Sequence, residues 1–343
     1  MSNKTQKSAV TARFSPKLVL SFVVSAVFLY LAFRNVPLDE LGSALGNVRI
    51  SWLVLAVGIS FLMMVLRAWR WQIEVRPLET IKLGKLWVVT SVAYMAINLL
   101  PVRLGEVVRP WLLSKRSTVS ISNVVGNLVV EKMMDSLCIV FYLLTGLLMV
   151  ETLPTWVRQG AIVPASIAVL LVTAVLLFWW KGNVFVDCFI RPIIPDRYAA
   201  KVKNLLAAAV DGMQILPNPR LLLSVLILSL ALWFLPILSS YVMMQAFNLS
   251  APFSAALVIF IFISFGTALP NLPGMIGPYQ YACQLALGIY GVSEVEALAY
   301  GLVLNAVQFF TIILQGLIAL PIAGVRFSEI RHASNQEITE LRK

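Results

Sequence analysis

Long apolar stretches alternate with short polar segments along almost the whole chain. Six of these stretches are close to the roughly 20 residues that an α-helix needs to cross a bilayer. The predicted full spans cover residues 17–33, 52–72, 123–149, 161–180, 221–247 and 297–323. The pattern therefore predicts an all-α integral membrane protein that crosses the bilayer about six times.

Two further apolar regions, 83–116 and 252–291, are interrupted near their middles by proline and glycine. The interrupting residues are Pro101 and Gly105 in the first region and Pro273, Gly274 and Gly277 in the second. Non-helical backbone survives at membrane depth only where it is buried in protein or lines a wet cavity. Each region is therefore predicted to be a re-entrant helical hairpin, and such broken segments are typical of transport sites, where they serve as gates.

The basic residues predict the orientation of these elements. Of the 27 Lys and Arg residues, 23 lie in the N-terminal segment, the C-terminal tail and residues 67–85, 102–116 and 181–220. Cytoplasmic loops carry an excess of Lys and Arg, so the first hairpin is expected to enter from the cytoplasm and return to it. No Lys or Arg occurs between Arg220 and Arg326, so the second hairpin is expected to enter from outside.

Each half of the chain then contains two spans, a hairpin and one more span, with the second half inverted. The segments "LPVRLGE" (100–106) and "LPGMIGP" (272–278) share Leu, Pro and Gly at matching offsets. We expect a first repeat over residues 1–150, an inverted second repeat over 151–325, and a tail over 326–343. Both termini are expected to be cytoplasmic, in a multi-pass protein of the cell inner (plasma) membrane.

Composition and charge narrow the function. The chain is 59% hydrophobic and carries a net charge of +11, which in a membrane protein reflects orientation and contact with anionic lipid rather than with nucleic acid. The single histidine, His332, lies in the tail, and the three cysteines form no CxxC pair. There is no GxxxxGK[ST] nucleotide motif. We therefore predict no catalytic residue, no metal site and no cofactor.

Candidate substrate-binding residues surround the break in the first hairpin. Arg103 and Arg109 flank Glu106, and free backbone N–H groups with two guanidinium groups suit a phosphate. Glu106 would hold an arginine in place or bind an ammonium group. Glu131 and Asp135 lie four residues apart on one face of the next span, and carboxylates inside membranes usually face a cavity or a basic partner.

Ordinary interfacial roles are the alternative for all of the arginines. Arg103 and Arg109 would then extend to the cytoplasmic interface and pair there with Glu106. In "RAWRWQ", Arg67 and Arg70 adjoin two tryptophans at the end of the second span, which is the usual composition of an interfacial anchor. Their functional interpretation is to meet lipid phosphates at the entrance of the transport path.

Four motifs together resemble a known family. They are R-x-x-R-W at Arg67–Trp71, N-x-x-P-x-R-x-G-E-x-x-R at Asn98–Arg109, E-x-x-x-D at Glu131–Asp135 and P-G-x-x-G at Pro273–Gly277. This set is similar to the flippase-like family whose best-known member supplies the transmembrane region of lysylphosphatidylglycerol synthase, the multiple peptide resistance factor. The resemblance implies movement of lipids between leaflets, including aminoacylated phosphatidylglycerol, and links stand-alone relatives to hopanoids and polyprenyl-linked glycans.

Two departures shape what we expect of this chain. Only about twenty polar residues follow the last predicted span, so the resemblance implies a stand-alone member without the synthase domain. Gln280 stands where the family often has Glu, which argues against a cationic headgroup. The prediction is a non-enzymatic flippase for an anionic or zwitterionic phospholipid or a polyprenyl-phosphate-linked lipid.

Two other functions stay open at this point. The first is an integral membrane transferase in which Glu131 and Asp135 bind a metal diphosphate. The second is a non-catalytic partner subunit of a lipid or glycan synthase. A homo-oligomer or a lipid-synthesis enzyme as partner is compatible with either the flippase or the subunit.

Overall fold

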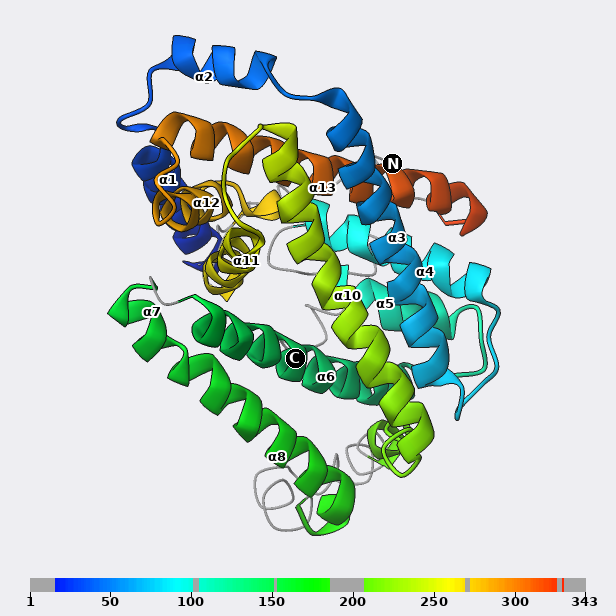
Figure 1. The fold of residues 1–343 in the computed structure, drawn as a ribbon. Coiled ribbons are helices and arrows are strands. Elements are labelled where there is room, and N and C mark those ends of the chain that lie inside the picture. The colour runs from blue at the N-terminus through cyan, green and yellow to red at the C-terminus, as the bar shows by residue number, and fades with distance from the viewer. Residues whose placement is uncertain are drawn as a thin grey trace, which may run out of the picture.

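The computed structural model describes residues 16–100, 105–150, 153–185, 207–268, 272–325 and 329. Within these ranges helices and turns make up the chain, and no strand is present (Figure 1). The helices are α1 (Pro16–Phe33), α2 (Leu38–Gly46), α3 (Ile50–Val75), α4 (Leu83–Leu99), α5 (Gly105–Ser114), α6 (Ile121–Met149), α7 (Thr155–Gly160), α8 (Ile162–Phe185), α10 (Pro219–Ala246), α11 (Phe253–Ala268), the 3-10 turn η3 (Pro273–Met275), α12 (Pro278–Gly288) and α13 (Glu294–Ile322). The all-α fold is confirmed.

Five helical segments in the described part of the chain are long and apolar enough to cross a membrane. They are α3, α6, α7 together with α8, α10 and α13. At about 1.5 Å per residue, a helix of this length spans about 40 Å, which exceeds the hydrocarbon core. The pair α1 and α2 is bent by 85° and counts as a sixth span at most. The chain is a multi-pass membrane protein, and its long helices lie where the apolar stretches predicted them.

Each of the two interrupted regions contains two α-helices in its described part. In the first, α4 packs against α5, and in the second, α11 packs against α12. Pro101 and Arg103 belong to residues 101–104, which lie outside the described part of the chain, as do residues 269–271 in the second break. The helical pairs stand at the predicted positions, and their entering the membrane from opposite sides stays a prediction.

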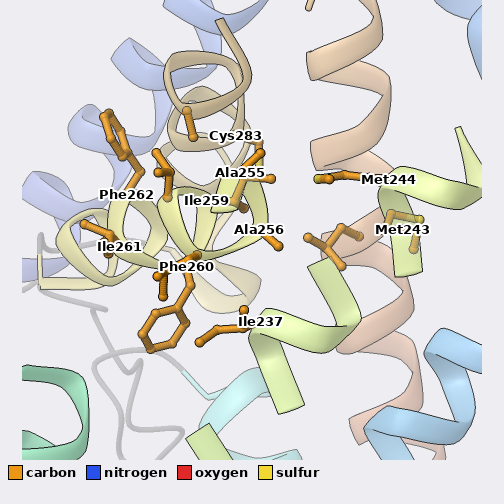
Figure 2. Close-up of a cluster of buried hydrophobic side chains, with 14 of the residues drawn as sticks. Ile237, Met243, Met244, Ala255, Ala256, Ile259, Phe260, Ile261, Phe262 and Cys283 are labelled. Carbon is orange, nitrogen blue, oxygen red and sulfur yellow. The ribbon is translucent and has the colours of Figure 1, made fainter. Parts of the chain in front are cut away.

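The largest apolar core is built around α11. Ala255, Ala256 and Ile259 of this helix face Met243 and Met244 of α10 in Figure 2, and α12 covers a further side. Residues 255–262 of α11 are all buried, so this part of the helix contacts protein rather than the surroundings on every side. The second hairpin is therefore held between other helices.

Contacts between the halves are extensive. Helix α3 packs along α10, α4 packs along α13, and α11 packs against α6. The α4–α13 contact is close, because a Cβ added at Gly316 would lie 2.3 Å from the Cβ of Met95. Each predicted half thus supplies a hairpin helix to the last span of the other half.

The described loops gather at two ends of the helix bundle. At one end, the Nε2 of Gln284 donates to the carbonyl oxygens of Ala32 (2.9 Å) and Glu294 (3.2 Å), so the α1–α2 turn adjoins the start of α13. The backbone N–H of Arg49 donates to the carbonyl oxygen of Ala246 at 3.0 Å, which adds the α2–α3 turn and the end of α10.

Basic loops meet at the other end. The guanidinium of Arg116 donates to the carbonyl oxygen of Ala323, and the ammonium of Lys85 donates to the carbonyl oxygen of Arg116. The backbone N–H of Thr118 donates to Glu79 at 2.8 Å. The α3–α4 loop, the α5–α6 loop and the end of α13 therefore share one end, as the distribution of Lys and Arg predicts for loops on one side of a membrane.

Candidate functional site: a buried charge cluster

Five charged side chains meet between α3, α5 and α6, and we refer to them as the charge cluster. They are Arg70, Glu74, Arg109, Glu131 and Asp135. Helical spacing explains how so few helices supply them. Arg70 and Glu74 lie four residues apart on α3, and Glu131 and Asp135 lie four residues apart on α6, so each pair occupies one face of its helix.

Arg70 is the centre of the cluster. Its Nη2 lies 2.8 Å from Oε1 of Glu131, and its Nη1 lies 2.6 Å from Oδ1 of Asp135 and donates to the Ser229 hydroxyl of α10 at 3.1 Å. Only 2% of its side chain is exposed. Both terminal nitrogens are therefore occupied, and Arg70 serves as the internal counterion of two carboxylates.

Glu131 bridges the two arginines. Its Oε2 accepts a hydrogen bond of 2.6 Å from Nη1 of Arg109, while its Oε1 faces Arg70. The guanidinium of Arg109 lies over the ring of Trp71, 3.9 Å from the ring centre. Trp71 is itself fixed, because its Nε1 donates to Asn127 Oδ1 at 2.9 Å. The orientation of Arg109 is thus set from two other helices, α3 and α6.

Asp135 closes the cluster toward α10. Its Oδ1 accepts from Nε1 of Trp233 at 2.8 Å as well as from Arg70. With 14% of its side chain exposed, against 2% for Glu131, it is the most accessible carboxylate among the ion pairs.

The cluster lies well inside the helix bundle. Glu131 follows the start of α6 by ten residues, which is about 15 Å along the helix axis. Charges at such depth are costly because the surroundings have a low dielectric constant, so they persist only when paired and are commonly functional. Burial also strengthens each ion pair, because little water screens it.

Arg109 is the arginine best placed to bind an anion. Its pairing with the cluster uses one terminal nitrogen, and its Nε has no hydrogen-bond partner among the described residues. Its side chain is 7% exposed, compared with 2% for Arg70. A guanidinium that is oriented and incompletely paired offers donors to a phosphate. Within the described ranges, no group of three or more His, Cys, Asp and Glu side chains is arranged to hold a metal ion.

The predicted site residues separate into two groups. Arg70, Arg109, Glu131 and Asp135 come together in the charge cluster. Glu106 is exposed on α5, which begins at Gly105.

Arg67 lies away from the cluster, although it is only one turn from Arg70. It donates to the Tyr94 hydroxyl of α4, and its guanidinium lies 4.3 Å from the centre of that ring. Arg70 and Arg109, in contrast, are buried, whereas an arginine at a membrane interface would be exposed.

The second-half motif is an ordered turn. Gly274 has φ of 78° and Gly277 has φ of 98°, conformations that favour glycine. The carbonyl oxygen of Gly274 accepts from Asn305 Nδ2 at 2.9 Å, and the backbone N–H of Gly277 donates to Gln280 Oε1 at 2.8 Å. Pro273 begins this turn. Gln280 therefore stabilises the start of α12, a role for which an amide oxygen suffices.

Four contributors escaped the sequence analysis. Trp71 reads as an interfacial tryptophan, and its stacking on Arg109 depends on tertiary contact. Ser229 and Trp233 are polar residues four apart within the apolar α10, a signal that the pattern did offer. Glu74 follows Arg70 by one helical turn near the end of an apolar span, and this spacing also points to one shared face.

Comparison with known proteins adds independent information. The sequence model of the family described as "Lysylphosphatidylglycerol synthase TM region" matches residues 18–316. A UPF0104 membrane protein of Methanothermobacter thermautotrophicus is 23% identical over 332 residues, covering 91% of this chain and 97% of that protein. The UPF0104 membrane protein MJ1078 of Methanocaldococcus jannaschii is 24% identical over 229 residues, covering 65% of this chain and 92% of that protein.

Proposed function

Because the chain belongs to the lysylphosphatidylglycerol synthase transmembrane-region family, we propose that it moves a lipid between membrane leaflets without chemically changing it. The substrate class is an anionic or zwitterionic phospholipid or a polyprenyl-phosphate-linked lipid. The observation that carries this proposal is the Arg109–Glu131–Arg70 arrangement, in which an oriented guanidinium is buried among helices long and apolar enough to cross a membrane.

A lipid headgroup must cross a region that strongly disfavours charge. Arg109 would accept the phosphate on the nitrogens that Glu131 does not use, while Trp71 keeps the guanidinium plane oriented. Arg70 stays in contact with both Glu131 and Asp135, so an anion can bind the remaining nitrogens of Arg109 while Arg109 keeps its ion pair with Glu131. The cost of burying the phosphate charge is thereby reduced.

The broken hairpins would supply the movement in this proposal. The Gly274–Gly277 turn and the break before Gly105 would act as gates on the two sides of the cluster, with Arg103 and Glu106 at the first gate and Arg67 at the entrance. The packing of α3 along α10 supports two inverted halves that rock against each other. In the proposed topology, both termini lie on the cytoplasmic side of the plasma membrane. The lipid is the only partner that this proposal needs.

Purified protein in liposomes tests the proposal. Fluorescent phosphatidylglycerol is placed in both leaflets, and an external quencher reports the rate at which the inner leaflet becomes accessible. Wild-type protein should accelerate this rate over empty liposomes. Arg109→Lys should slow it by at least about tenfold, because an ammonium does not reproduce the planar grip of a guanidinium on phosphate.

Arg49→Lys is the matched control. Arg49 is exposed at the start of α3, and the same substitution there should leave the rate unchanged. Equal loss in both variants would mean that the site is wrong. Absence of wild-type acceleration for phosphatidylglycerol and for a polyprenyl phosphate would contradict lipid movement itself and favour the transferase or the partner subunit.

A further inference from the structure

Glu74 is the one member of the charge cluster without a close partner. Its side chain is fully buried, and neither carboxylate oxygen has a hydrogen-bond partner among the described residues. Its one ion pair within the described part of the chain is with Nε of Arg70, at 3.5 Å, whereas the other ion pairs of the cluster measure 2.6–2.8 Å.

The charges of the cluster do not balance. Two guanidinium groups face three carboxyl groups, so full ionisation leaves one negative charge uncompensated. Arg70 has committed both terminal nitrogens to Glu131 and Asp135, and Arg109 pairs with Glu131. The uncompensated charge therefore falls on Glu74. A buried carboxyl group in this situation is far more stable when it carries a proton.

Among the described residues, α4 and α10 supply no other countercharge to Glu74, and Lys132 of α6 is exposed and acts on Glu131. Helix α10 faces the cluster with Ser229 and Trp233, which do not ionise, and its own ionisable residues, Arg220 and Tyr241, lie in its first turn and toward its opposite end. On α4, Tyr94 is engaged by Arg67 and Lys85 by the loop carbonyl of residue 116.

Helix α13 brings ionisable groups only near its distant start. Glu294 and Glu296 lie in its first turn, and the Tyr300 hydroxyl donates to the carbonyl oxygen of Ser240 at 2.9 Å. Among described residues, the charged groups facing Glu74 are therefore Arg70 on its own helix, Arg109 on α5, and Glu131 and Asp135 on α6.

We propose that Glu74 is a proton-binding site, and that a proton and the lipid phosphate occupy the charge cluster together. This inference rests on the proposed function and adds its coupling ion. With Glu74 protonated, the cluster is electrically neutral and a phosphate brings one negative charge into it. With Glu74 ionised, the same phosphate would join a cluster that is already negative.

Linkage makes this coupling reciprocal. If a proton on Glu74 raises the affinity of the cluster for phosphate, phosphate at Arg109 raises the affinity of Glu74 for a proton by the same factor. The proton comes from the solution on the side where the lipid enters and returns to the solution where the lipid leaves. A pH difference across the membrane would then drive net lipid movement in one direction.

Infrared difference spectroscopy tests the proton site without relying on transport. The full chain in nanodiscs should show the carbonyl band of a protonated carboxylic acid, and Glu74→Gln should remove this band. Glu40 is an exposed carboxylate on α2, so the control variant Glu40→Gln should retain it. Adding dioctanoyl phosphatidylglycerol near the pH at which the band fades should restore it. A band that persists in Glu74→Gln would overturn the assignment. Should that variant fail to fold, Glu74→Met removes the group with an unbranched side chain of similar length.

Lipid movement tests the coupling. In the liposome assay, the wild-type rate should fall with rising pH by up to about tenfold per pH unit, the limit for a single proton. Glu74→Gln cannot ionise at this position, so its rate relative to its own maximum should vary by less than about twofold over the same range. An unchanged pH profile in Glu74→Gln would overturn the coupling. If wild-type protein moves no lipid at any pH, the proposed function fails, and the infrared band still decides the proton site.

Discussion

The pairing of Arg70 with Asp135 allows the energy of the charge cluster to be measured. Replacing Arg70 by Met removes contacts of 2.8 Å to Glu131, 2.6 Å to Asp135 and 3.1 Å to Ser229. The carboxylates of Glu131 and Asp135 then lose a countercharge at once. Breaking one buried pair from one side costs about 3–5 kcal/mol, so Arg70→Met should lower the free energy of unfolding by at least that amount.

A double-mutant cycle separates the ion pair from the loss of packing. Asp135→Asn removes the negative charge but keeps an oxygen that accepts from Trp233. If the two charges stabilise each other directly, the Arg70→Met/Asp135→Asn variant should be more stable than the sum of the single effects predicts. A buried contact of 2.6 Å is expected to give a coupling of about 1.5–3 kcal/mol.

The assay is reversible unfolding in mixed micelles with increasing sodium dodecyl sulfate, followed by tryptophan fluorescence and circular dichroism. The exposed pair Glu79 and Thr118 provides the control, since a cycle at the surface should give less than about 1 kcal/mol. A coupling below about 0.5 kcal/mol for Arg70 and Asp135 would refute the claim that this ion pair organises the interface of α3 and α6.

Three further outcomes are expected. Gly277→Ala should lower the free energy of unfolding by about 1–3 kcal/mol, because the φ of Gly277 is 98° and a Cβ there would lie 2.4 Å from a carbonyl oxygen of α1. Gly288 has open space around it, so Gly288→Ala should be near neutral in the same unfolding assay. The hydroxyl of Thr118 holds the pKa of Glu79 below its ordinary value of 4.5. The stability that this hydrogen bond adds is therefore present above pH 4.5 and is lost as the pH falls through the lowered pKa. The difference in free energy of unfolding between wild type and Thr118→Val should shrink over that range. Glu294→Cys should react with a membrane-impermeant thiol reagent from outside intact cells, and labelling only after lysis would contradict the inverted second half.

Length and polarity alone were enough to predict the membrane helices. Each long apolar stretch became a helix because a backbone in lipid must satisfy its own hydrogen bonds. Residues 123–149 illustrate this, since α6 runs from Ile121 to Met149. The turn at Pro273, Gly274 and Gly277 could also be predicted, because proline and glycine interrupt helices for local reasons. Glu131 and Asp135 could also be assigned to one face from their spacing.

The partners of these charges were decided only by tertiary packing. Arg67 and Arg70 lie in one short segment, with Trp69 two residues after Arg67 and immediately before Arg70. Three residues on a helix turn the side chain by about 300°, so the two arginines leave α3 about 60° apart. This difference directs Arg67 to Tyr94 on α4 and Arg70 to Glu131 on α6.

The imbalance of the charge cluster has the same origin. Local sequence indicates that Glu74 and Arg70 share a face, and a simple i, i+4 ion pair would be the expected result. In the folded chain, Glu131 and Asp135 approach Arg70 more closely and occupy its terminal nitrogens, which leaves Glu74 buried without a close partner. Sequence spacing determines which charges lie on one helix face, but the competition among carboxylates for one guanidinium depends on distances between helices, which only packing sets.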